Sequence, residues 1–222
     1  MKIFFVTFLV FIALAFNSNA VVDNNILSCE ITPTMKTDHI PIDINLSGNL
    51  YRKAGSAVVA KGRYIELHGK VLDGDCVPIS GAKVQIWQAD RKGKYQEHYF
   101  VKSQWDKQDP DYDPNFGFSG TAITNNQGDF SFITIFPGSL DDNAPHINVS
   151  VTHLDFKDVT TRIYFDKHPM NISDKNLQNL PPSNQTLVTA RGSTLKQKGK
   201  KVSGLHYDVI IALEGVSKYK RY

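Results

Sequence analysis

The chain has 222 residues, 41% of them hydrophobic, and a formal net charge of +3 at pH 7. This length is enough for one domain with a substantial core, and so small a charge does not favour nucleic acid as a partner. The lysine group near the C-terminus has no aromatic residues between its members, which is typical of a solvated loop. Its members are Lys196, Lys198, Lys200 and Lys201.

The first residues have the pattern of an export signal. Lys2 precedes an apolar run from Ile3 to Phe16, and small residues follow up to Ala20. We predict that residues 1–20 are a cleaved signal peptide and that the protein is secreted or periplasmic. A membrane anchor is the alternative, but about 14 apolar residues are too few to cross a bilayer comfortably. We expect no membrane partner once the signal is removed.

Cys29 and Cys76 are the only cysteines in the sequence. Export to an oxidising compartment favours a disulfide between them. Two separate buried thiols are the alternative, and a metal would need more soft ligands than two cysteines provide.

Short alternating runs separated by turn residues predict an all-β domain. Ile65, Leu67 and Val71 share one face of a strand, and the turn at residues 125–128 predicts a hairpin into residues 129–136. The other predicted strands are residues 82–87, 147–151, 160–165 and 206–213. No window of twelve residues has a helical stripe, so we predict a single β-sandwich with long loops and little helix.

The predicted domain organisation has three parts after the signal. Residues 21–60 form an N-terminal extension, residues 61–215 form the sandwich, and residues 216–222 form a basic tail. Residues 102–115 are predicted as a long loop, and residues 175–201 as irregular structure. The aromatic residues predicted to lie in the core are Trp87, Phe130, Phe132 and Phe136, whereas those predicted to line a cleft are Trp105, Tyr112 and Phe116.

Several ordered motifs resemble a known enzyme family. They are Gly69-Lys70-Val71-Leu72-Asp73, residues 78–90 (PISGAKVQIWQAD), Gly93-Lys94-Tyr95, Asp113-Pro114-Asn115-Phe116, residues 128–138 (GDFSFITIFPG), Pro145-His146-Ile147 and residues 160–165 (TTRIYF). Together they resemble the intradiol ring-cleavage dioxygenases, the family of protocatechuate 3,4-dioxygenase and catechol 1,2-dioxygenase. The short spacing between Pro-Gly and His is most similar to the exported branch of that family.

The resemblance implies a β-sandwich that holds a non-haem Fe(III) ion with two tyrosinates and two histidines. It implies an aromatic diol as substrate and ring opening with dioxygen between the hydroxyl-bearing carbons. Phenolates are hard anionic donors that stabilise Fe(III), and imidazoles complete the shell without adding charge. The family's His-x-His spacing points both imidazoles to one face of a strand.

Only half of this ligand set is present. Tyr95 occupies the first tyrosine position and His146 the first histidine position, while Leu140 and Asn148 stand at the second tyrosine and second histidine positions. Leucine has no donor atom, and a neutral amide oxygen is a poor transition-metal ligand. We therefore expect weakened iron binding and impaired or lost standard activity.

Other residues near these positions bear on the same prediction. Asn143 replaces an arginine of the family pattern, and Arg162 stands where a glutamine is frequent. A substitute shell, suited to Fe(II), would draw on Asp141, Asp142, His98, Tyr99, Tyr112 or His153. However, the odd separation of His153 from His146 places the two on opposite faces of a regular strand.

Three functional hypotheses remain. The first is an exported dioxygenase with an altered iron shell, in which Tyr95 and His146 are ligands. The second is a catalytically silent sandwich that binds a small aromatic molecule or a protein partner; Tyr95 is then a partly buried tyrosine with a hydrogen-bonded hydroxyl, and His146 a structural histidine. The third is a structural role, such as a cell-envelope or extracellular scaffold.

Overall fold

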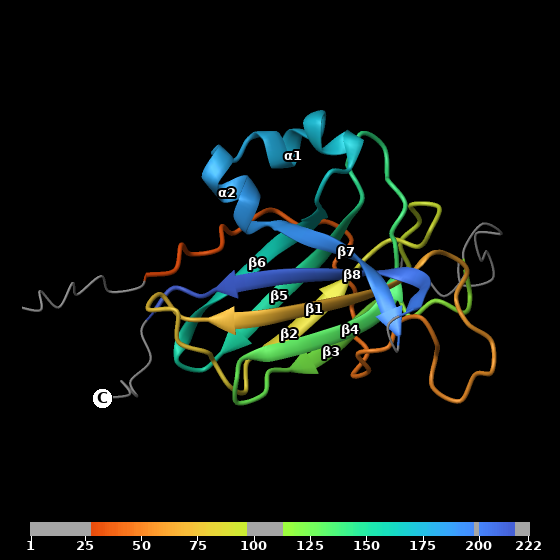
Figure 1. The fold of residues 1–222 in the computed structure, drawn as a ribbon, viewed down its shortest axis with the longest axis horizontal. Helices are drawn as coiled ribbons and strands as arrows, with labels where there is room; N and C mark the ends of the chain where they lie inside the picture. Colours follow the sequence, from red (N-terminus) through yellow and green to blue (C-terminus); the bar gives the residue numbers. More distant parts are fainter. Residues whose placement is uncertain (1–27, 97–112, 198–199, 216–222) are drawn as a thin grey trace, which may run out of the picture.

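The structure is a computed structural model that describes residues 28–96, 113–197 and 200–215 (Figure 1). Several predictions lie outside these residues. They are the signal peptide at residues 1–20, the tail at residues 216–222, Lys198, and most of the long loop, together with His98, Tyr99, Trp105 and Tyr112. No helix among the described residues is long and apolar enough to cross a membrane.

Eight strands form one sheet in the order β3-β2-β5-β6-β7-β8-β1-β4. The strands are β1 (Tyr64–Leu72), β2 (Lys83–Trp87), β3 (Ser119–Ile123), β4 (Asp129–Ile135), β5 (His146–His153), β6 (Phe156–Phe165), β7 (Thr189–Gln197) and β8 (Lys200–Ala212). The sheet folds into two layers, with β8, β1 and β4 in front of β5, β2 and β3 (Figure 1). The prediction of an all-β sandwich is thus confirmed.

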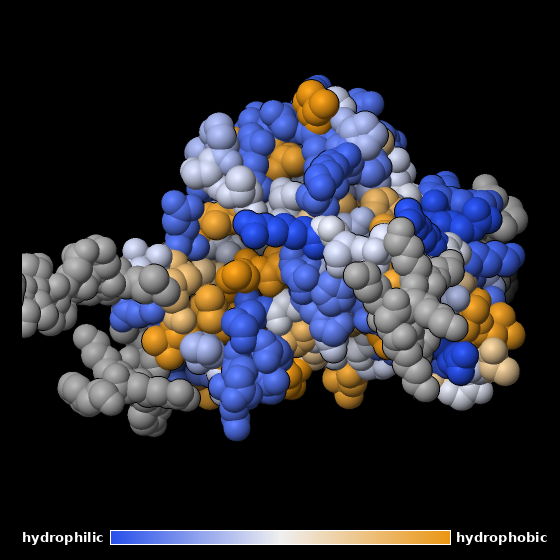
Figure 2. All heavy atoms as spheres, in the orientation of Figure 1, coloured by the Kyte–Doolittle hydropathy of each residue, from blue (hydrophilic) through white to orange (hydrophobic). Residues whose placement is uncertain are grey.

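The two halves of the sheet meet at a narrow seam. β6 and β7 pair in parallel through only two residue pairs, Tyr164 with Thr189 and Phe165 with Ala190. The four-stranded halves on either side of this seam enclose one hydrophobic core, to which both contribute buried side chains. The face shown in Figure 2 is largely hydrophilic, with scattered hydrophobic side chains.

The core follows the alternation of the strands. Ile65, Leu67 and Val71 are fully buried, as predicted. Gly69 lies in the same row, and a Cβ atom there would come within 2.2 Å of the Phe130 ring, so this ring fills the place of a side chain. Of the predicted aromatic core, Trp87, Phe130 and Phe132 are buried and Phe136 is partly buried.

The end of β4 departs from the predicted alternation. In a strictly alternating strand Ile135 faces away from the side that carries Phe130 and Phe132, but it is fully buried. The reason is local packing, because the chain at Gly62, just before β1, lies against Ile135. A Cβ atom added to Gly62 would be 3.1–3.3 Å from side-chain atoms of Ile135.

The prediction of irregular structure over residues 175–201 was wrong. This segment contains α1 (Lys175–Gln178), α2 (Pro182–Leu187) and β7, and the 3-10 helix η2 (Pro169–Ile172) precedes it. Asp174 caps α1 by accepting a hydrogen bond of 2.9 Å from the Leu177 amide, and Pro182 occupies the first turn of α2, where its missing N–H costs nothing. β3 was also missed.

Residues 28–60 are part of the folded unit. The Thr32 amide donates to the Ala212 carbonyl and the Met35 amide to the Thr160 carbonyl, so the segment is bonded to strands of both halves of the sheet. Leu50 is fully buried in the core. Cys29 and Cys76 form a disulfide with an S–S distance of 2.06 Å.

Phe116 does not line a cleft, contrary to the sequence-based prediction. It is fully buried and packs edge-to-face on Phe118 at a centroid distance of 4.7 Å. The amide of neighbouring Gly117 donates to the Leu50 carbonyl, which draws this end of the long loop into the core. The hydrophobic effect therefore overrides the loop-like composition around it.

Candidate functional site

Two loops bring the family positions together. The Gly93 loop follows β2 and carries Tyr95, and the Gly138 loop follows β4 and carries Leu140. Each glycine packs against the other loop: a Cβ on Gly93 would lie 2.0 Å from the Ser139 carbonyl oxygen, and one on Gly138 would lie 2.3 Å from the Gly93 nitrogen. Gly93 also has φ of 82°, which favours glycine.

Buried Asp90 organises both loops. Its side chain accepts hydrogen bonds from the amides of Lys92 at 2.8 Å and Lys94 at 3.1 Å. Its carbonyl oxygen accepts from the amides of Gly93 and Gly138. One aspartate thus fixes the turn that carries Tyr95 and attaches the neighbouring loop to it.

Tyr95, His146 and Asn148 form a hydrogen-bonded chain. His146 and Asn148 lie on one face of β5, two residues apart, as the spacing predicts. The His146 Nδ1 lies 2.8 Å from the Ala144 carbonyl, which only accepts, so Nδ1 carries the proton and Nε2 keeps its lone pair. The Tyr95 hydroxyl is 3.4 Å from that Nε2, and it accepts a hydrogen bond of 3.1 Å from the Asn148 amide nitrogen.

The surroundings keep both ionisable groups neutral. Burial raises the pKa of Tyr95 to about 12, although the Asn148 hydrogen bond and the charge of Arg162 act in the opposite direction. Burial lowers the pKa of His146 to about 4, against the effect of its hydrogen bond to Ala144. At neutral pH the pair is therefore a phenol beside a neutral imidazole.

The N-terminal segment completes the site, and sequence reasoning missed it. Arg162 is 2% exposed and donates to the Lys36 carbonyl at 3.0 Å and to the Asp38 carboxylate at 2.7 Å. The His39 ring stacks on Tyr95 with centroids 4.3 Å apart and an interplanar angle of 12°. Residues 21–60 have no period or motif that signals these contacts. The Trp87 indole, which donates to the Asp38 carbonyl, is a further anchor.

The other two substituted positions, Leu140 and Asn143, make their hydrogen bonds outside this chain. Leu140 is partly buried, and its carbonyl accepts a hydrogen bond from the amide of Asn143. Asn143 in turn accepts from the Asn176 side chain at 2.8 Å, which ties it to α1. Asp141 and Asp142, considered for a substitute shell, are exposed. His153 lies at the far end of β5, where it accepts from the Asp155 amide.

The donor set does not fit the Fe(III) site that the family resemblance implies. Tyr95 and His146 are close enough to act as neighbouring ligands, and the Ala144 carbonyl orients the imidazole as an outer partner of a metal ligand would. However, Leu140 offers no donor, and the Asn148 amide nitrogen faces the Tyr95 hydroxyl. The buried Asn148 Oδ1 and Arg162 Nη1 have no hydrogen-bond partner among the described residues. A neutral amide oxygen does not replace an imidazole for this ion.

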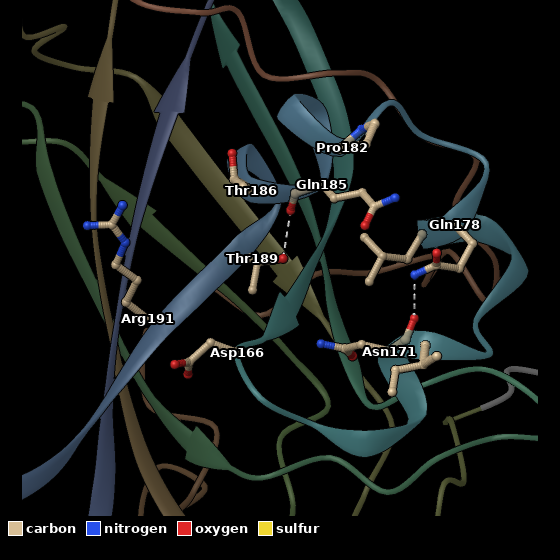
Figure 3. Close-up of a pocket in the computed structure, with 10 residues that line it drawn as sticks. Asp166, Asn171, Gln178, Pro182, Gln185, Thr186, Thr189 and Arg191 are labelled. Carbon is tan, nitrogen blue, oxygen red and sulfur yellow. Dashed lines mark hydrogen bonds between the residues drawn. The ribbon is translucent and has the colours of Figure 1, made fainter.

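Two open grooves lie away from this chain of side chains. One, of about 650 Å³, is lined by residues of η2, α1, α2 and β7, with Asp166 and Arg191 at one side and Gln178 at the other (Figure 3). The other, of about 560 Å³, has Phe136, Phe165 and Tyr207 among its lining residues. Neither groove includes Tyr95 or His146.

Comparison with known proteins shows the family and the fold of this chain. The family model described as "Dioxygenase" matches residues 48–215, so the chain is a member of a dioxygenase family. A Rickettsia bellii protein named "Putative dioxygenase" is 34% identical over 180 residues, which cover 80% of this chain and 83% of that protein. The protocatechuate 3,4-dioxygenase beta chain of Burkholderia cepacia is 28% identical over 179 residues, covering 77% and 72% of the two chains.

Solved structures show the same fold. An intradiol ring-cleavage dioxygenase from Tetranychus urticae superposes with a TM-score of 0.63 at 21% identity, covering 86% of this chain and 98% of that one. The 3-chlorocatechol 1,2-dioxygenase of Rhodococcus opacus superposes with a TM-score of 0.61 at 18% identity, covering 86% and 75%. The chain therefore belongs to the intradiol ring-cleavage dioxygenase family, as the motifs around Tyr95 and His146 predicted.

Proposed function

We propose that this chain is an exported member of the intradiol family in which Fe(III)-dependent ring cleavage is lost or greatly weakened. One observation carries the proposal: the Tyr95 hydroxyl is hydrogen-bonded to Asn148 and His146, and the remaining family position is Leu140. Tyr95 and His146 are thus hydrogen-bonded within the protein, and two of the four iron ligands expected for the family are missing. The neutral state of both groups at neutral pH is consistent with this reading.

Metal content and oxygen uptake test the proposal directly. Tag-free protein, produced with iron supplied in the medium, is expected to hold no stoichiometric iron and to lack the visible charge-transfer band of a tyrosinate bound to Fe(III). It is also expected to consume no oxygen with catechol or protocatechuate. Stoichiometric iron with ring opening, both abolished in Tyr95→Phe, would contradict the proposal.

Restoring the missing donors gives a matched comparison. The double variant Leu140→Tyr, Asn148→His is expected to bind iron, whereas each single variant is not, because three donors still leave the shell short of one anion or one imidazole. Far-UV circular dichroism of all three variants checks that they are folded. Failure of a folded double variant to bind iron would show that these residues do not occupy the ligand positions.

The proposed ligand class is the small aromatic diol, on which the family acts. Calorimetric titration of the iron-free protein with catechol and protocatechuate separates binding from catalysis. Heat of binding without oxygen uptake is the expected result for a silent binding protein.

Export is part of the same proposal and has its own measurement. Mass spectrometry of the protein recovered from outside the cytoplasm is expected to find an N-terminus at Val21, directly after the small residues Ser18-Asn19-Ala20. Recovery of the chain with residues 1–20 still attached would overturn the predicted cleavage.

A further inference from the structure

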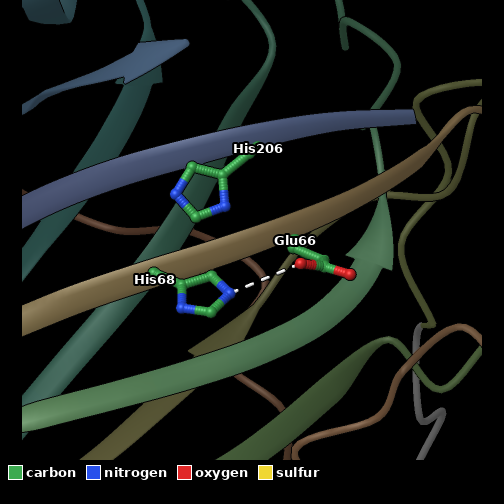
Figure 4. A group of neighbouring side chains, drawn as sticks. All are labelled: Glu66, His68 and His206. Atoms are coloured by element: carbon green, nitrogen blue, oxygen red, sulfur yellow. Dashed lines mark ion pairs between the residues drawn. The ribbon is translucent and has the colours of Figure 1, made fainter. Parts of the chain in front are cut away.

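A second group of metal-ligating side chains lies in the other half of the sheet from His146 and Asn148. Glu66 and His68 belong to β1, and His206 belongs to the adjacent strand β8 (Figure 4). Among the described residues, these three form the group of histidine and acidic side chains whose ligand atoms lie close enough together to hold a metal ion. The family resemblance assigns no role to any of them.

The strand register explains why they converge. Residues two apart on a strand point to the same face, which brings Glu66 and His68 together on the side of β1 away from buried Ile65 and Leu67. β1 and β8 run parallel, with Glu66 beside His206 and His68 beside Asp208. Carboxylates and imidazoles therefore alternate over two neighbouring strands.

The distances are close to those of a binding site. One ligand atom of each of Glu66, His68 and His206 lies within 4.8 Å of the other two. The His68 Nε2 is 3.5 Å from the Glu66 Oε2, and the two imidazole rings have centroids 4.6 Å apart. In a tetrahedral site with bonds of about 2.0–2.1 Å, donor atoms are about 3.4 Å apart, so no pair of these ligand atoms would have to approach by more than about 1.4 Å.

Neighbouring groups hold two of the ligands in place. The His206 Nε2 is 2.9 Å from the Asp208 carboxylate, and when Nε2 carries the proton, Nδ1 keeps its lone pair for an ion. The Tyr64 hydroxyl donates to the Glu66 Oε1 at 2.8 Å, which leaves Oε2 on the side of His68. This combination of ligand and outer partner is typical of metal-binding histidines.

The cluster is open to solvent. The side chains of His68, Glu66 and His206 are 45%, 30% and 24% exposed, so an ion reaches them without opening the core. A strand framework with neighbours on both sides fixes the backbone at these positions, since β1 lies between β4 and β8. Binding therefore orders only side chains, which limits its entropic cost.

We propose that Glu66, His68 and His206 bind one divalent transition-metal ion, with Zn²⁺ as the best-suited ion. Two imidazoles and one carboxylate are a ligand set that Zn²⁺ accepts in tetrahedral geometry, with water in the fourth position. Ca²⁺ and Mg²⁺ are disfavoured because they require oxygen ligands. The site is separate from Tyr95 and His146 and does not depend on the proposed loss of ring cleavage.

Titration of the protein with Zn²⁺ tests this site. Tag-free protein is first dialysed against a chelator, because a polyhistidine tag would compete for the ion, and binding is then followed by calorimetry. One ion per chain is expected, with a rise in the melting temperature of the protein on binding. A Ca²⁺ titration under the same conditions is expected to give no binding.

Variants locate the ion. His68→Gln, His206→Gln and Glu66→Gln are each expected to weaken Zn²⁺ binding by about tenfold or more, since each removes one of three protein ligands. His153→Gln, which changes a histidine outside the cluster, is the matched control and is expected to bind like the unmodified protein. Circular dichroism confirms that each variant is folded.

Substitution by Co²⁺ gives a second readout that does not depend on stability. A site with two imidazoles and one carboxylate is expected to produce a visible absorption spectrum, lost in His68→Gln and His206→Gln. Unchanged Zn²⁺ binding in these two variants, loss of binding in His146→Gln, or one ion shared between two chains would each overturn the proposed site.

Discussion

Among the described residues, the Tyr95 hydroxyl is the hydrogen-bond acceptor of the Asn148 amide nitrogen, which gives Tyr95 a structural role. Tyr95→Phe leaves the amide nitrogen of fully buried Asn148 without an acceptor. We expect the free energy of unfolding to fall by about 1–3 kcal/mol, the cost of an unsatisfied buried polar group. Urea denaturation measures this difference.

Tyr207→Phe is the matched control for that experiment. The Tyr207 ring is buried, but among the residues that the structure describes its hydroxyl has no hydrogen-bond partner. Removing it is expected to change the free energy of unfolding by less than about 0.5 kcal/mol. Equal losses in the two variants would show that the Tyr95 hydroxyl has no special structural role.

The buried His146 imidazole predicts a loss of stability in acid. Its pKa falls from 6.5 to about 4 on folding, so between these values the unfolded chain binds a proton that the folded chain does not. Stability contributed by the neutral imidazole is complete above pH 6.5 and is lost as the pH falls toward 4, with a total on the order of 3 kcal/mol. Denaturation curves collected from pH 7 to 4 measure it.

Carboxylates also titrate between pH 7 and 4, so the effect of His146 is isolated by comparing the pH dependence of the free energy of unfolding between variants. His146→Gln is expected to have a shallower acid dependence than the unmodified protein, whatever its stability at pH 7. His153→Gln is expected to keep the full dependence, because His153 is more exposed at the opposite end of β5. If the free energy of unfolding falls equally with pH in His146→Gln and in the unmodified protein, His146 is not the source of the acid dependence.

At the scale of elements, the contact between the Gly93 and Gly138 loops positions Tyr95. Gly93 and Gly81 have almost the same φ, 82° and 78°, but a Cβ on Gly93 would lie 2.0 Å from the Ser139 carbonyl oxygen, whereas one on Gly81 has nothing within 4 Å. Gly81→Ala is therefore expected to cost only the left-handed backbone penalty of about 1–2 kcal/mol. Gly93→Ala should cost clearly more, because the loops must separate.

Thermal and urea denaturation of the two alanine variants check this prediction. Near-UV circular dichroism is an additional readout, since displacement of the Gly93 loop changes the environment of Tyr95. Equal destabilisation of the two variants would mean that the loops separate without cost and do not fix the site.

The sequence predicts those elements whose pattern is set by the core. β1 was recognisable because Ile65 and Leu67 alternate with polar residues in a strand that has one face buried. β7 was missed because it is composed mainly of small and polar residues and is specified by pairing with β8, not by its own periodicity. Helices of four and six residues, such as α1 and α2, are too short for a helical stripe to be visible.

The same distinction holds for the site. Tyr95, His146, Leu140 and Asn148 were identified from motifs, and the structure brings Tyr95, His146 and Asn148 into one chain of contacts. The contacts of Asp38 and His39 were not predictable. They arise only when residues 28–60 pack across the sheet, and tertiary contacts of this kind leave no local sequence pattern.

For the whole molecule, the disulfide attaches the N-terminal segment to the sandwich. Cys29 and Cys76 are separated by 47 residues, and closing a loop of this length stabilises the folded chain by about 3–4 kcal/mol in the chain-entropy model. The double variant Cys29→Ser, Cys76→Ser is expected to unfold at lower denaturant concentration by this amount. Reduction of the unmodified protein should give a similar loss; no loss in either case would contradict the estimate.

The position of β8 has a consequence for how the chain acquires its fold. This last strand lies between β7 and β1, and it pairs with β1 near the beginning of the sandwich, residue 205 beside residue 65. Such distant pairing is slow, and β1 lacks one of its two neighbours until β8, more than 130 residues later, has been synthesised. For the export proposed above, this order means that the chain would reach the translocation machinery before its front layer is complete, while it can still be threaded through a channel.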